Sequence, residues 1–256
     1  MTAAASIEEE RDQGAIPLWR HAGWRDRFPW LVQGTTGAGD DDVAFDLGLF
    51  GEQPVGKVIG RWRELRAATG MSTSLHARQV HGAEVRCHSD GVGSGMVVME
   101  GFDGHVTAQG GVLLAVSIAD CIPVSLVDEE GRAVALLHAG WRGVAGGIVE
   151  RALRLMRDEL SIPPSALWLH CGPAICGDCY EVGPEVHAAV TPEETLPAGP
   201  APIDLRAALI RRAVRHGVAD GRCSISSHCT RCGPVDFFSH RGGSAGRQMG
   251  VLGLSR

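Results

Sequence analysis

The sequence predicts a single α/β domain. Three observations support this class: apolar runs of strand length, segments whose apolar residues recur at helical spacing, and no strict β-α-β repeat. At 256 residues the chain is long enough for one large core, and its 44% hydrophobic and 21% charged residues are typical of a globular protein. No segment is long enough to act as a linker between two domains.

The elements of the first half follow a polar segment. We expect residues 1–29 to form a poorly structured N-terminal extension and residues 30–256 to form the folded domain. Helical spacing of Val58, Trp62 and Leu65 predicts a helix over 55–69. Strands are expected over 30–33, over 75–85 with an interruption at 79–82, and over 103–107.

The second half alternates more regularly. Apolar residues recur every three or four positions from Ile148 to Leu160, which predicts a helix over 144–160. Asp204 is a suitable N-cap for a helix over 205–216, which Gly217 ends. Strands are expected over 167–171, 224–227, 237–240 and 251–254.

Between the two halves, residues 112–138 have the pattern of one β-hairpin. Two apolar runs flank Asp128-Glu-Glu-Gly131, the polar cluster expected to form the turn. With Glu129 and Glu130 as the loop, Cys121 faces His138. Directly opposed side chains have Cβ atoms about 4.5–5.5 Å apart, so this pair could share one metal ion.

Composition and charge disfavour several classes of partner. The formal net charge is −6 and the chain has no basic run, so we expect no nucleic-acid partner. Residues 1–12 lack the apolar region of a signal peptide, and no apolar stretch reaches the length of a membrane span. We therefore expect a cytoplasmic protein, with no membrane partner, whose eight cysteines are reduced.

A third candidate metal ligand is His81. Together His81, Cys121 and His138 form a His₂Cys set, which suits zinc and leaves a fourth position for water or substrate. A zinc ion there would lower the pKa of a bound water or act as a Lewis acid. Asp120 is a candidate proton acceptor or ligand-orienting residue. Taken singly, each of the three residues fits a structural role better than a ligand role, and spacing alone leaves the set open.

Two C-x-x-C pairs compete for a metal. They are Cys176/Cys179 and Cys229/Cys232, separated by a long segment that includes a predicted helix. Paired knuckles usually lie closer in sequence when they share a zinc ion. We therefore expect Cys229 and Cys232 to be cavity-lining thiols rather than half of a closed Cys₄ site.

Arginines supply the candidate anion-binding groups. Arg61, Arg142, Arg241 and Arg247 each lie beside a motif-like turn, and the chain's basic residues include a single lysine. A guanidinium group binds phosphate or carboxylate through two parallel hydrogen bonds. Tyr180, the only tyrosine, is a candidate for stacking on a substrate, although anchoring a buried loop is an equal alternative.

Several longer motifs resemble those of a known family. They are, in order, Gln79-Val-His-Gly82, Ala119-Asp-Cys-Ile-Pro-Val124, His138-Ala-Gly-Trp-Arg-Gly143, Gly172-Pro-Ala-Ile175, Cys179-Tyr-Glu-Val-Gly183, Cys229-Thr-Arg-Cys232, Phe237-Phe-Ser-His-Arg241 and Gly246-Arg247. Their order and length match the YfiH/laccase-domain family, also called the multicopper polyphenol oxidoreductase or purine nucleoside phosphorylase family. The resemblance runs from about Trp30 to Leu254. His240 is a departure, since it stands where tyrosine is common.

The resemblance implies a fold, a metal and an activity. The fold is a single layered α/β/α sandwich with a mixed sheet, and the metal is one zinc ion, with copper as the other possibility, bound by His81, Cys121 and His138. The implied activity is phosphorolysis of purine nucleosides (adenosine, inosine, guanosine and methylthioadenosine), with adenosine deamination as a companion. Purine nucleoside and phosphate are then the partners, bound by a set that comprises Arg61, Gln79, Arg142, Tyr180 and Arg241. His81, Cys121, His138 and Asp120 are the catalytic candidates, in a monomer or small homo-oligomer.

Three alternatives remain at this point. A hydrolase that edits peptidoglycan precursors would use Cys121 as nucleophile and His138 as base. A copper-dependent polyphenol oxidase is disfavoured because the chain has no H-x-H pair. A non-enzymatic module with structural zinc would unfold on loss of Cys121, whereas an enzyme would stay folded and lose activity.

Overall fold

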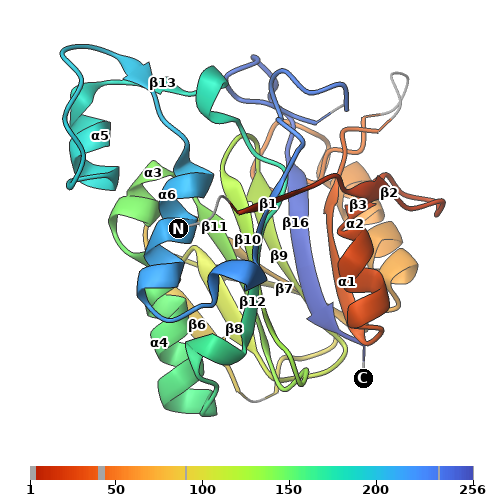
Figure 1. Cartoon of the computed structure of the whole chain (residues 1–256). Helices are drawn as coiled ribbons and strands as arrows, with labels where there is room; N and C mark the ends of the chain where they lie inside the picture. The colour runs from red at the N-terminus through yellow and green to blue at the C-terminus, as the bar shows by residue number, and fades with distance from the viewer. Residues whose placement is uncertain (1–3, 40–43, 90, 236, 256) are drawn as a thin grey trace.

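The computed structural model describes residues 4–39, 44–89, 91–235 and 237–255. In this part of the chain two seven-stranded sheets pack face to face, with helices on the outer sides (Figure 1). The layers are therefore helix, sheet, sheet, helix. The α/β class and the mixed strand direction are confirmed, and the expected α/β/α layering contains two central sheets rather than one.

Both sheets mix parallel and antiparallel strands. The first has the order β1-β15-β12-β10-β11-β8-β6, made of Ala5–Ile7, Cys223–Ser226, Leu167–Cys171, Ile122–Asp128, Val134–Ala139, Gly104–Thr107 and Val85–His88. The second has the order β2-β3-β4-β16-β9-β5-β7, made of Glu10–Arg11, Leu18–Arg20, Leu31–Thr36, Gln248–Leu254, Val112–Ile118, Thr73–Arg78 and Gly95–Glu100. A short separate pair joins β13 (Glu181–Val182) to β14 (Ala201–Pro202).

The helices cover the sheets unequally. They are α1 (Ala22–Arg27), α2 (Val55–Thr69), α3 (Trp141–Ala145), α4 (Ile148–Leu160), α5 (Pro184–Val190) and α6 (Leu205–Arg215), with single 3₁₀ turns η1 (Pro164–Ala166), η2 (Gly177–Cys179) and η3 (Asp220–Arg222). α4 and α6 pack on the first sheet and α2 on the second (Figure 1). Among the described helices, none combines the length and the apolar character needed to span a bilayer.

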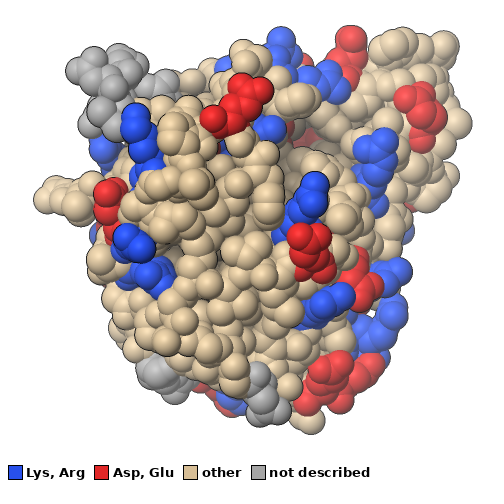
Figure 2. Space-filling model, turned by 180° about the vertical axis from the view of Figure 1, so that it is seen from behind, with Lys and Arg blue, Asp and Glu red and all other residues tan. Residues whose placement is uncertain are grey.

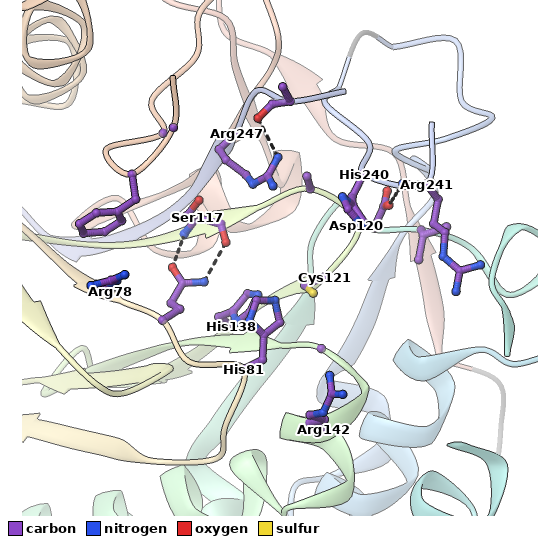
Figure 3. A pocket seen from close by; sticks show the side chains of 18 of the residues that line it. Arg78, His81, Ser117, Asp120, Cys121, His138, Arg142, His240, Arg241 and Arg247 are labelled. Atoms are coloured by element: carbon purple, nitrogen blue, oxygen red, sulfur yellow. Dashed lines mark hydrogen bonds between the residues drawn. The ribbon is translucent and has the colours of Figure 1, made fainter. Parts of the chain in front are cut away.

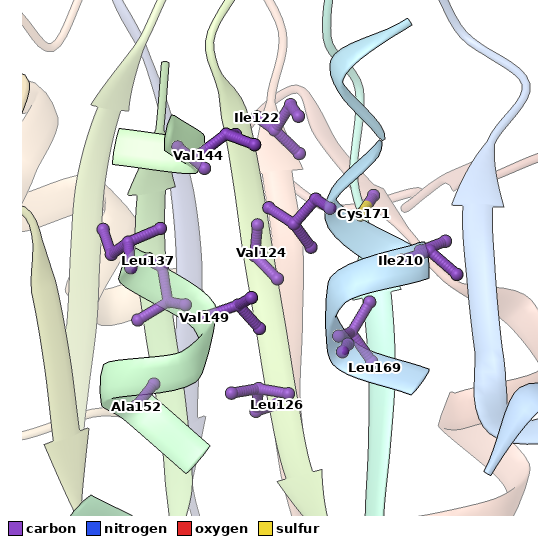
Figure 4. Close-up of a cluster of buried hydrophobic side chains, with 14 of the residues drawn as sticks. Ile122, Val124, Leu126, Leu137, Val144, Val149, Ala152, Leu169, Cys171 and Ile210 are labelled. Atoms are coloured by element: carbon purple, nitrogen blue, oxygen red, sulfur yellow. The ribbon is translucent and has the colours of Figure 1, made fainter. Parts of the chain in front are cut away.

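Alternation of side chains along the central strands builds the core. In β10, Val124 and Leu126 face the helices (Figure 4), whereas Val127 faces the other sheet. In β11, Leu137 faces the helices and Leu136 faces the other sheet. Strands buried on both faces read as continuous apolar runs, which is why this part of the sequence shows no polar alternation.

The helix predicted over 144–160 is confirmed in its main part. It begins at Ile148 because Gly146 and Gly147 separate α3 from α4, and Gly147 has a φ of +79°. Its buried face consists of Ile148, Val149, Ala152, Leu153 and Met156.

The chain crosses from the second sheet to the first at three places in the described residues. Residues 79–84 join β5 to β6, residues 101–103 join β7 to β8, and residues 119–121 join β9 to β10. The strand expected over 75–85 and the hairpin expected over 112–138 are therefore each divided between the two sheets. The crossings at 79–84 and 119–121 carry candidate ligands.

The register of the β10–β11 hairpin differs from the prediction. Val127 pairs with Val134 and Pro123 with His138, so Cys121 lies diagonally from His138 rather than opposite it. The loop is longer than two residues because the Asp128 carboxylate accepts hydrogen bonds from the Arg132 amide (3.0 Å) and guanidinium (2.8 Å). A shift of two residues keeps every side chain on its expected face.

The N-terminal residues were expected to be poorly structured, and from residue 4 onward this is wrong. β1 pairs in parallel with β15, β2 and β3 form a hairpin, and α1 follows. Glu9 is 1% exposed, and its carboxylate accepts hydrogen bonds from Ser226 and from His170 Nε2, the latter at 2.9 Å. A buried acidic group that is neutralised by partners distant in sequence leaves no pattern in a polar segment.

A strand was also expected over 237–240, and none forms there. The Gln248 side chain replaces a strand partner, because its amide donates to the Phe238 carbonyl (3.0 Å) and its oxygen accepts from the Phe238 amide.

Candidate metal centre and active-site cavity

His81, Cys121 and His138 meet at one point between the sheets. Their ligand atoms all lie within 4.8 Å of one another, and Figure 3 shows the three side chains converging. His81 lies on the crossing at 79–84, Cys121 on the crossing at 119–121, and His138 near the end of β11. His138 is buried, Cys121 is half-buried and His81 is exposed. The three-residue set is therefore accessible to solvent on the side of His81.

The backbone of the crossings at 79–84 and 119–121 is unusual for residues with side chains. His81 has a φ of 57° and Asp120 a φ of 86°. Non-glycine residues in this region cost on the order of 1–3 kcal/mol and persist where the surroundings hold them. At His81 the amide donates to Asp103 Oδ1 at 2.9 Å, and at Asp120 the carboxylate is held on both oxygens.

Asp103 organises two of the three ligands. Its carboxylate accepts from His138 Nδ1 (2.9 Å) and from the amides of His81 (2.9 Å) and Gly82 (2.8 Å). The His138 Nε2 atom is thereby turned toward Cys121 and His81, as in metal sites where a carboxylate orients the ligating imidazole. Burial opposes ionisation of Asp103, but the hydrogen bonds from His138 and the backbone outweigh it and lower its pKa. Asp103 lies in none of the sequence motifs, and for this reason it was not among the predicted site residues.

The electrostatics of the set favour an ionised thiol. Burial acts against it, yet the neighbouring His138 and His81 lower the pKa of Cys121 to about 6. The same pairing raises the pKa of His138 to about 9, with Cys121 and Asp103 outweighing burial. Thiolate is the form of cysteine that binds metal. The donor types, their proximity and the oriented imidazole therefore fit a zinc ion.

The set opens onto a cavity of about 650 Å³. This is within the usual range for a small-molecule site. Its wall combines polar side chains with aromatic and apolar ones. The aromatic and apolar residues include Phe50, Trp141, Ile175, Tyr180 and Leu205. A ligand with a flat ring and an ionic group matches such a lining.

Four arginines line the cavity: Arg78, Arg142, Arg241 and Arg247. None of the four forms an ion pair with a carboxylate of the described residues. The arginines that do form such ion pairs lie outside the cavity wall. On the face seen in Figure 2, basic and acidic side chains are interspersed. The cavity therefore concentrates positive charge in a protein of net charge −6.

Most of the predicted substrate residues reach the cavity. Gln79, Arg142, Tyr180 and Arg241 line it, and the Arg241 guanidinium lies 4.9 Å from the centre of the Tyr180 ring. Arg61 does not line it. Its Nη1 atom donates to the carbonyl of Asp46 at 2.9 Å, so it supports the loop that carries Asp46.

Two of the lining residues, Gln79 and Asp120, are held by hydrogen bonds within the protein. The Gln79 side-chain amide forms hydrogen bonds with both backbone groups of Ser117, at 2.7 and 2.8 Å. These bonds connect the crossing at 79–84 to the end of β9. Asp120 Oδ1 accepts from Thr230 and Ser239, both at 2.7 Å, and Oδ2 accepts from the Arg241 amide at 2.7 Å. These bonds position the wall of the cavity and engage both side chains with the protein.

Arg78 lines the cavity and was not among the predicted residues. It directly precedes the Gln79-Val-His-Gly82 motif, and its guanidinium lies 5.4 Å from the centre of the Phe50 ring. Its position at the end of β5, one residue before the motif, is the signal that would have indicated it.

The expectation that Cys229 and Cys232 line the cavity is wrong. Neither lies in its wall, and the four cysteines of the two C-x-x-C pairs come together instead, with their sulfur atoms within 4.8 Å of one another.

The chain matches known proteins over most of its length. A family model described as multi-copper polyphenol oxidoreductase laccase matches residues 42–255. The purine nucleoside phosphorylase YlmD of Geobacillus stearothermophilus is 35% identical over 191 residues, which cover 68% of this chain and 70% of that protein. The crystal structure of YlmD superposes with a TM-score of 0.87 at 29% identity and covers 97% of this chain and 100% of that one.

Two further relatives are a second purine nucleoside phosphorylase and an adenosine deaminase. A purine nucleoside phosphorylase of Deinococcus radiodurans is 38% identical over 201 residues, 75% of either chain. Adenosine deaminase RL5, from an unknown prokaryotic organism, is 35% identical over 181 residues, which cover 67% of this chain and 68% of that protein. The family match and these relatives agree with the motifs around His81, Cys121 and His138, and the chain belongs to the multi-copper polyphenol oxidoreductase laccase family.

Proposed function

We propose that this protein is a zinc-dependent purine nucleoside phosphorylase with adenosine deaminase as a companion activity. Its substrates are phosphate and a purine nucleoside such as adenosine, inosine, guanosine or methylthioadenosine. One observation carries the proposal: a His₂Cys ligand set opens into a cavity whose four arginines have no carboxylate partner among the described residues. The names of the relatives support the same reaction.

The arginines are suited to hold the phosphate. Arg78 and Arg247 belong to the side of the second sheet. Arg142 lies in the first turn of α3 and Arg241 lies beside Tyr180, and Figure 3 places the two pairs on different sides of Cys121. The guanidinium groups of Arg241 and Arg247 each donate to backbone carbonyls through Nη1 only, which leaves their other N–H groups for an anion. Phosphate bound by one pair is desolvated and oriented, which is the main contribution an enzyme makes to a bimolecular displacement.

In the reaction a phosphate oxygen forms a bond to C1′ of the sugar while the bond from C1′ to the purine nitrogen breaks. The electron pair leaves with the base, which takes up a proton, and the products are free base and pentose 1-phosphate. We propose that Tyr180 and Trp141 contact the flat base, since both are aromatic residues of the cavity wall. Arg142 and Arg241 lie beside these two rings and are our candidates for the phosphate pair.

His81, Cys121 and His138 would hold the zinc ion, with Asp103 orienting His138. When bound, zinc supplies a Lewis acid for a substrate oxygen or nitrogen and lowers the pKa of a coordinated water. We prefer zinc to copper because three nitrogen and sulfur ligands with one open position suit a catalytic zinc, and because no methionine, the usual axial ligand of a His₂Cys copper site, is among the described residues that line the cavity. The absence of any H-x-H pair from the sequence argues in the same direction.

Asp120 has a positioning role in this proposal rather than a proton-transfer role. Three hydrogen bonds occupy its carboxylate, and Glu181, the acidic residue that follows Tyr180 in the sequence, does not line the cavity. Asp46, which also lines the cavity, is held through Oδ1 by the amides of Gly48 (2.8 Å) and Arg247 (2.9 Å), so the protein itself engages each carboxylate of the described cavity wall. We therefore expect deamination to be slower than phosphorolysis.

A cysteine hydrolase is the second candidate, because Cys121, His138 and Asp103 form the contacts of a thiol, base and acid triad. His81 distinguishes the two. A triad has no use for a second imidazole at the thiol, whereas a metal site requires a third ligand at this position. The contact of His81 with Cys121 therefore favours the metal enzyme.

Incubation of purified protein with inosine, with and without phosphate, tests the proposal. We expect hypoxanthine to be released only with phosphate, and release to be abolished in Cys121→Ser while the variant keeps a wild-type circular dichroism spectrum. Lack of turnover of every purine nucleoside at micromolar enzyme would overturn the assignment. Phosphate-independent conversion of adenosine to inosine would measure the companion activity.

A further inference from the structure

The two C-x-x-C pairs form a second cluster, here called the thiol tetrad: Cys176, Cys179, Cys229 and Cys232. The four sulfur atoms lie within 4.8 Å of one another, and Sγ of Cys176 is 3.8 Å from Sγ of Cys232. Four thiolates around one zinc ion at about 2.3 Å each are separated by about 3.8 Å. The spacing of the tetrad is therefore close to that of a filled tetrahedral site.

Sheet pairing explains how pairs so distant in sequence meet. β12 and β15 are parallel neighbours, with Cys171 facing Ile225, and each leads directly into one of the loops. A further bridge pairs Ala174 with Cys229, and the Thr230 amide donates to the Ala174 carbonyl at 3.2 Å. The two loops thus leave the same edge of the sheet side by side.

Each pair is folded as a tight turn that points its sulfur atoms inward. The Cys179 amide donates to the Cys176 carbonyl (3.2 Å), and the Gly233 amide donates to the Cys229 carbonyl (3.1 Å). Sγ of Cys229 also accepts from the amides of Cys176 (3.3 Å) and Arg231 (3.4 Å). Two N–H groups directed at one sulfur stabilise negative charge on it, which is the charge state that a metal ligand needs.

We propose that the thiol tetrad binds one structural zinc ion, separate from the ion at His81, Cys121 and His138. Four cysteine ligands leave no open position, so this site is closed and has no catalytic ion. Tetrahedral sulfur sets also suit iron. We assign zinc because the tetrad joins two loops at the end of neighbouring strands, as closed structural zinc sites do. In addition, none of its four cysteines lines the cavity.

The tetrad fixes loops that border the cavity. Ile175 and Tyr180 of the cavity wall flank the first pair, and Thr230 of the second pair binds Asp120. Arg231 closes the arrangement, since its Nη1 donates to the carbonyl of Cys179 at 3.1 Å. The inference concerns metal content and loop stability, so it holds whether or not the protein is a phosphorylase.

Metal content of purified protein, measured by mass spectrometry of the elements, tests the inference. We expect Cys176→Ser/Cys232→Ser to lose one equivalent of zinc relative to wild type and to melt at a lower temperature. Cys87→Ser removes a half-buried cysteine outside the tetrad and should keep the wild-type zinc content. Unchanged zinc in the double variant, or iron in place of zinc, would overturn the assignment.

A second measurement remains informative if the double variant does not fold. Cys121→Ser leaves the tetrad as the remaining cysteine-containing cluster, and Co²⁺ can replace zinc in it. We expect the intense sulfur-to-cobalt absorption of a four-thiolate tetrahedral site in this background. A spectrum without those bands, or a protein mass lowered by disulfide formation after purification under reducing conditions, would contradict a metal at the tetrad.

Discussion

The metal centre of the cavity and the thiol tetrad both contain cysteine, but they differ in ligand number, backbone and surroundings. His81, Cys121 and His138 lie where the chain crosses between the sheets, and two positive φ angles occur there. The tetrad lies on two tight turns beyond neighbouring strands, and its residues avoid positive φ. Three ligands facing a cavity suit chemistry, whereas four ligands joining two loops suit structure.

From this difference we expect the two clusters to control different properties of the protein. A change in the open centre should remove activity and leave the fold, because two packed sheets hold that centre from both sides. A change in the tetrad should loosen two loops and lower stability first. Each of the following experiments tests one side of this contrast.

The largest effect is expected from Cys121→Ser. The substitution removes the thiolate that contacts both histidines and completes the three-ligand set. The rate of phosphorolysis should therefore fall by a factor on the order of 10³ or more. The melting temperature should change by only a few degrees. Steady-state kinetics and thermal unfolding measure the two quantities, and unfolding of the variant at room temperature would favour a structural role for the centre.

The tetrad variant Cys176→Ser/Cys232→Ser should give the opposite result. Losing a structural zinc ion removes several kcal/mol of binding energy, so we expect the melting temperature to fall by roughly 5 °C or more. Activity measured well below the melting temperature should fall less than in Cys121→Ser. Equal loss of activity in the two variants would erase the distinction between the clusters.

Asp103→Asn probes how the open centre is held. The amide keeps the shape but cannot accept from His138 and three backbone amides with the same strength, so zinc affinity or activity should fall by about 10- to 100-fold. Zinc competition with a chelating dye measures this. Asp158→Asn, which changes an exposed carboxylate, is the matched control and should behave as wild type.

Arg142→Gln tests the phosphate site. Removing one unpaired guanidinium should raise the KM for phosphate about 10-fold, with a smaller effect on the KM for nucleoside. Arg157→Gln, on the exposed face of α4, serves as the control. An unchanged KM for phosphate would place the anion at Arg78 and Arg247 instead.

The smallest effect is expected from Glu9, which supports the strand leading to the tetrad. Burial opposes its ionisation, but His170 and Ser226 lower its pKa below the usual 4.5. In acid the unfolded chain therefore binds the proton more readily, so the stability contributed by Glu9 is present above pH 4.5 and is lost as pH falls through the lower folded pKa. Glu9→Gln should cost on the order of 1 kcal/mol at neutral pH, and the gap to wild type should narrow in acid.

Chemical denaturation at several pH values measures the Glu9 effect. The free energy of unfolding of wild type should decline more steeply in acid than that of Glu9→Gln. Parallel curves would show that the carboxylate is not stabilised in the folded state.

Motifs and periodicity predicted the parts of the molecule that depend on neighbouring residues. The helix ending at Leu160 and the N-cap of Asp204, which accepts from the amides of Arg206 and Ala207, are examples. The side chains of Cys121 and His138 were placed on the correct face because an error of two residues preserves the alternation. His81 was added as a third candidate ligand from its residue type, and the family resemblance then implied the same three-ligand set.

Features that depend on distant pairing were not predictable from these patterns. The division of residues 112–138 between two sheets leaves no trace, because strands buried on both faces have the same apolar composition in either sheet. Asp103 acts through a carboxylate bound to another crossing of the chain. The tetrad forms through the pairing of β12 with β15, which sequence separation alone argues against.

Phosphorus-31 NMR of a reaction with inosine and phosphate tests the central claim most directly. The account predicts that wild type converts inorganic phosphate into ribose 1-phosphate, that Cys121→Ser produces none above background, and that Cys176→Ser/Cys232→Ser still produces it at low temperature. Hypoxanthine release without any ribose 1-phosphate would contradict phosphorolysis at the His81, Cys121 and His138 centre.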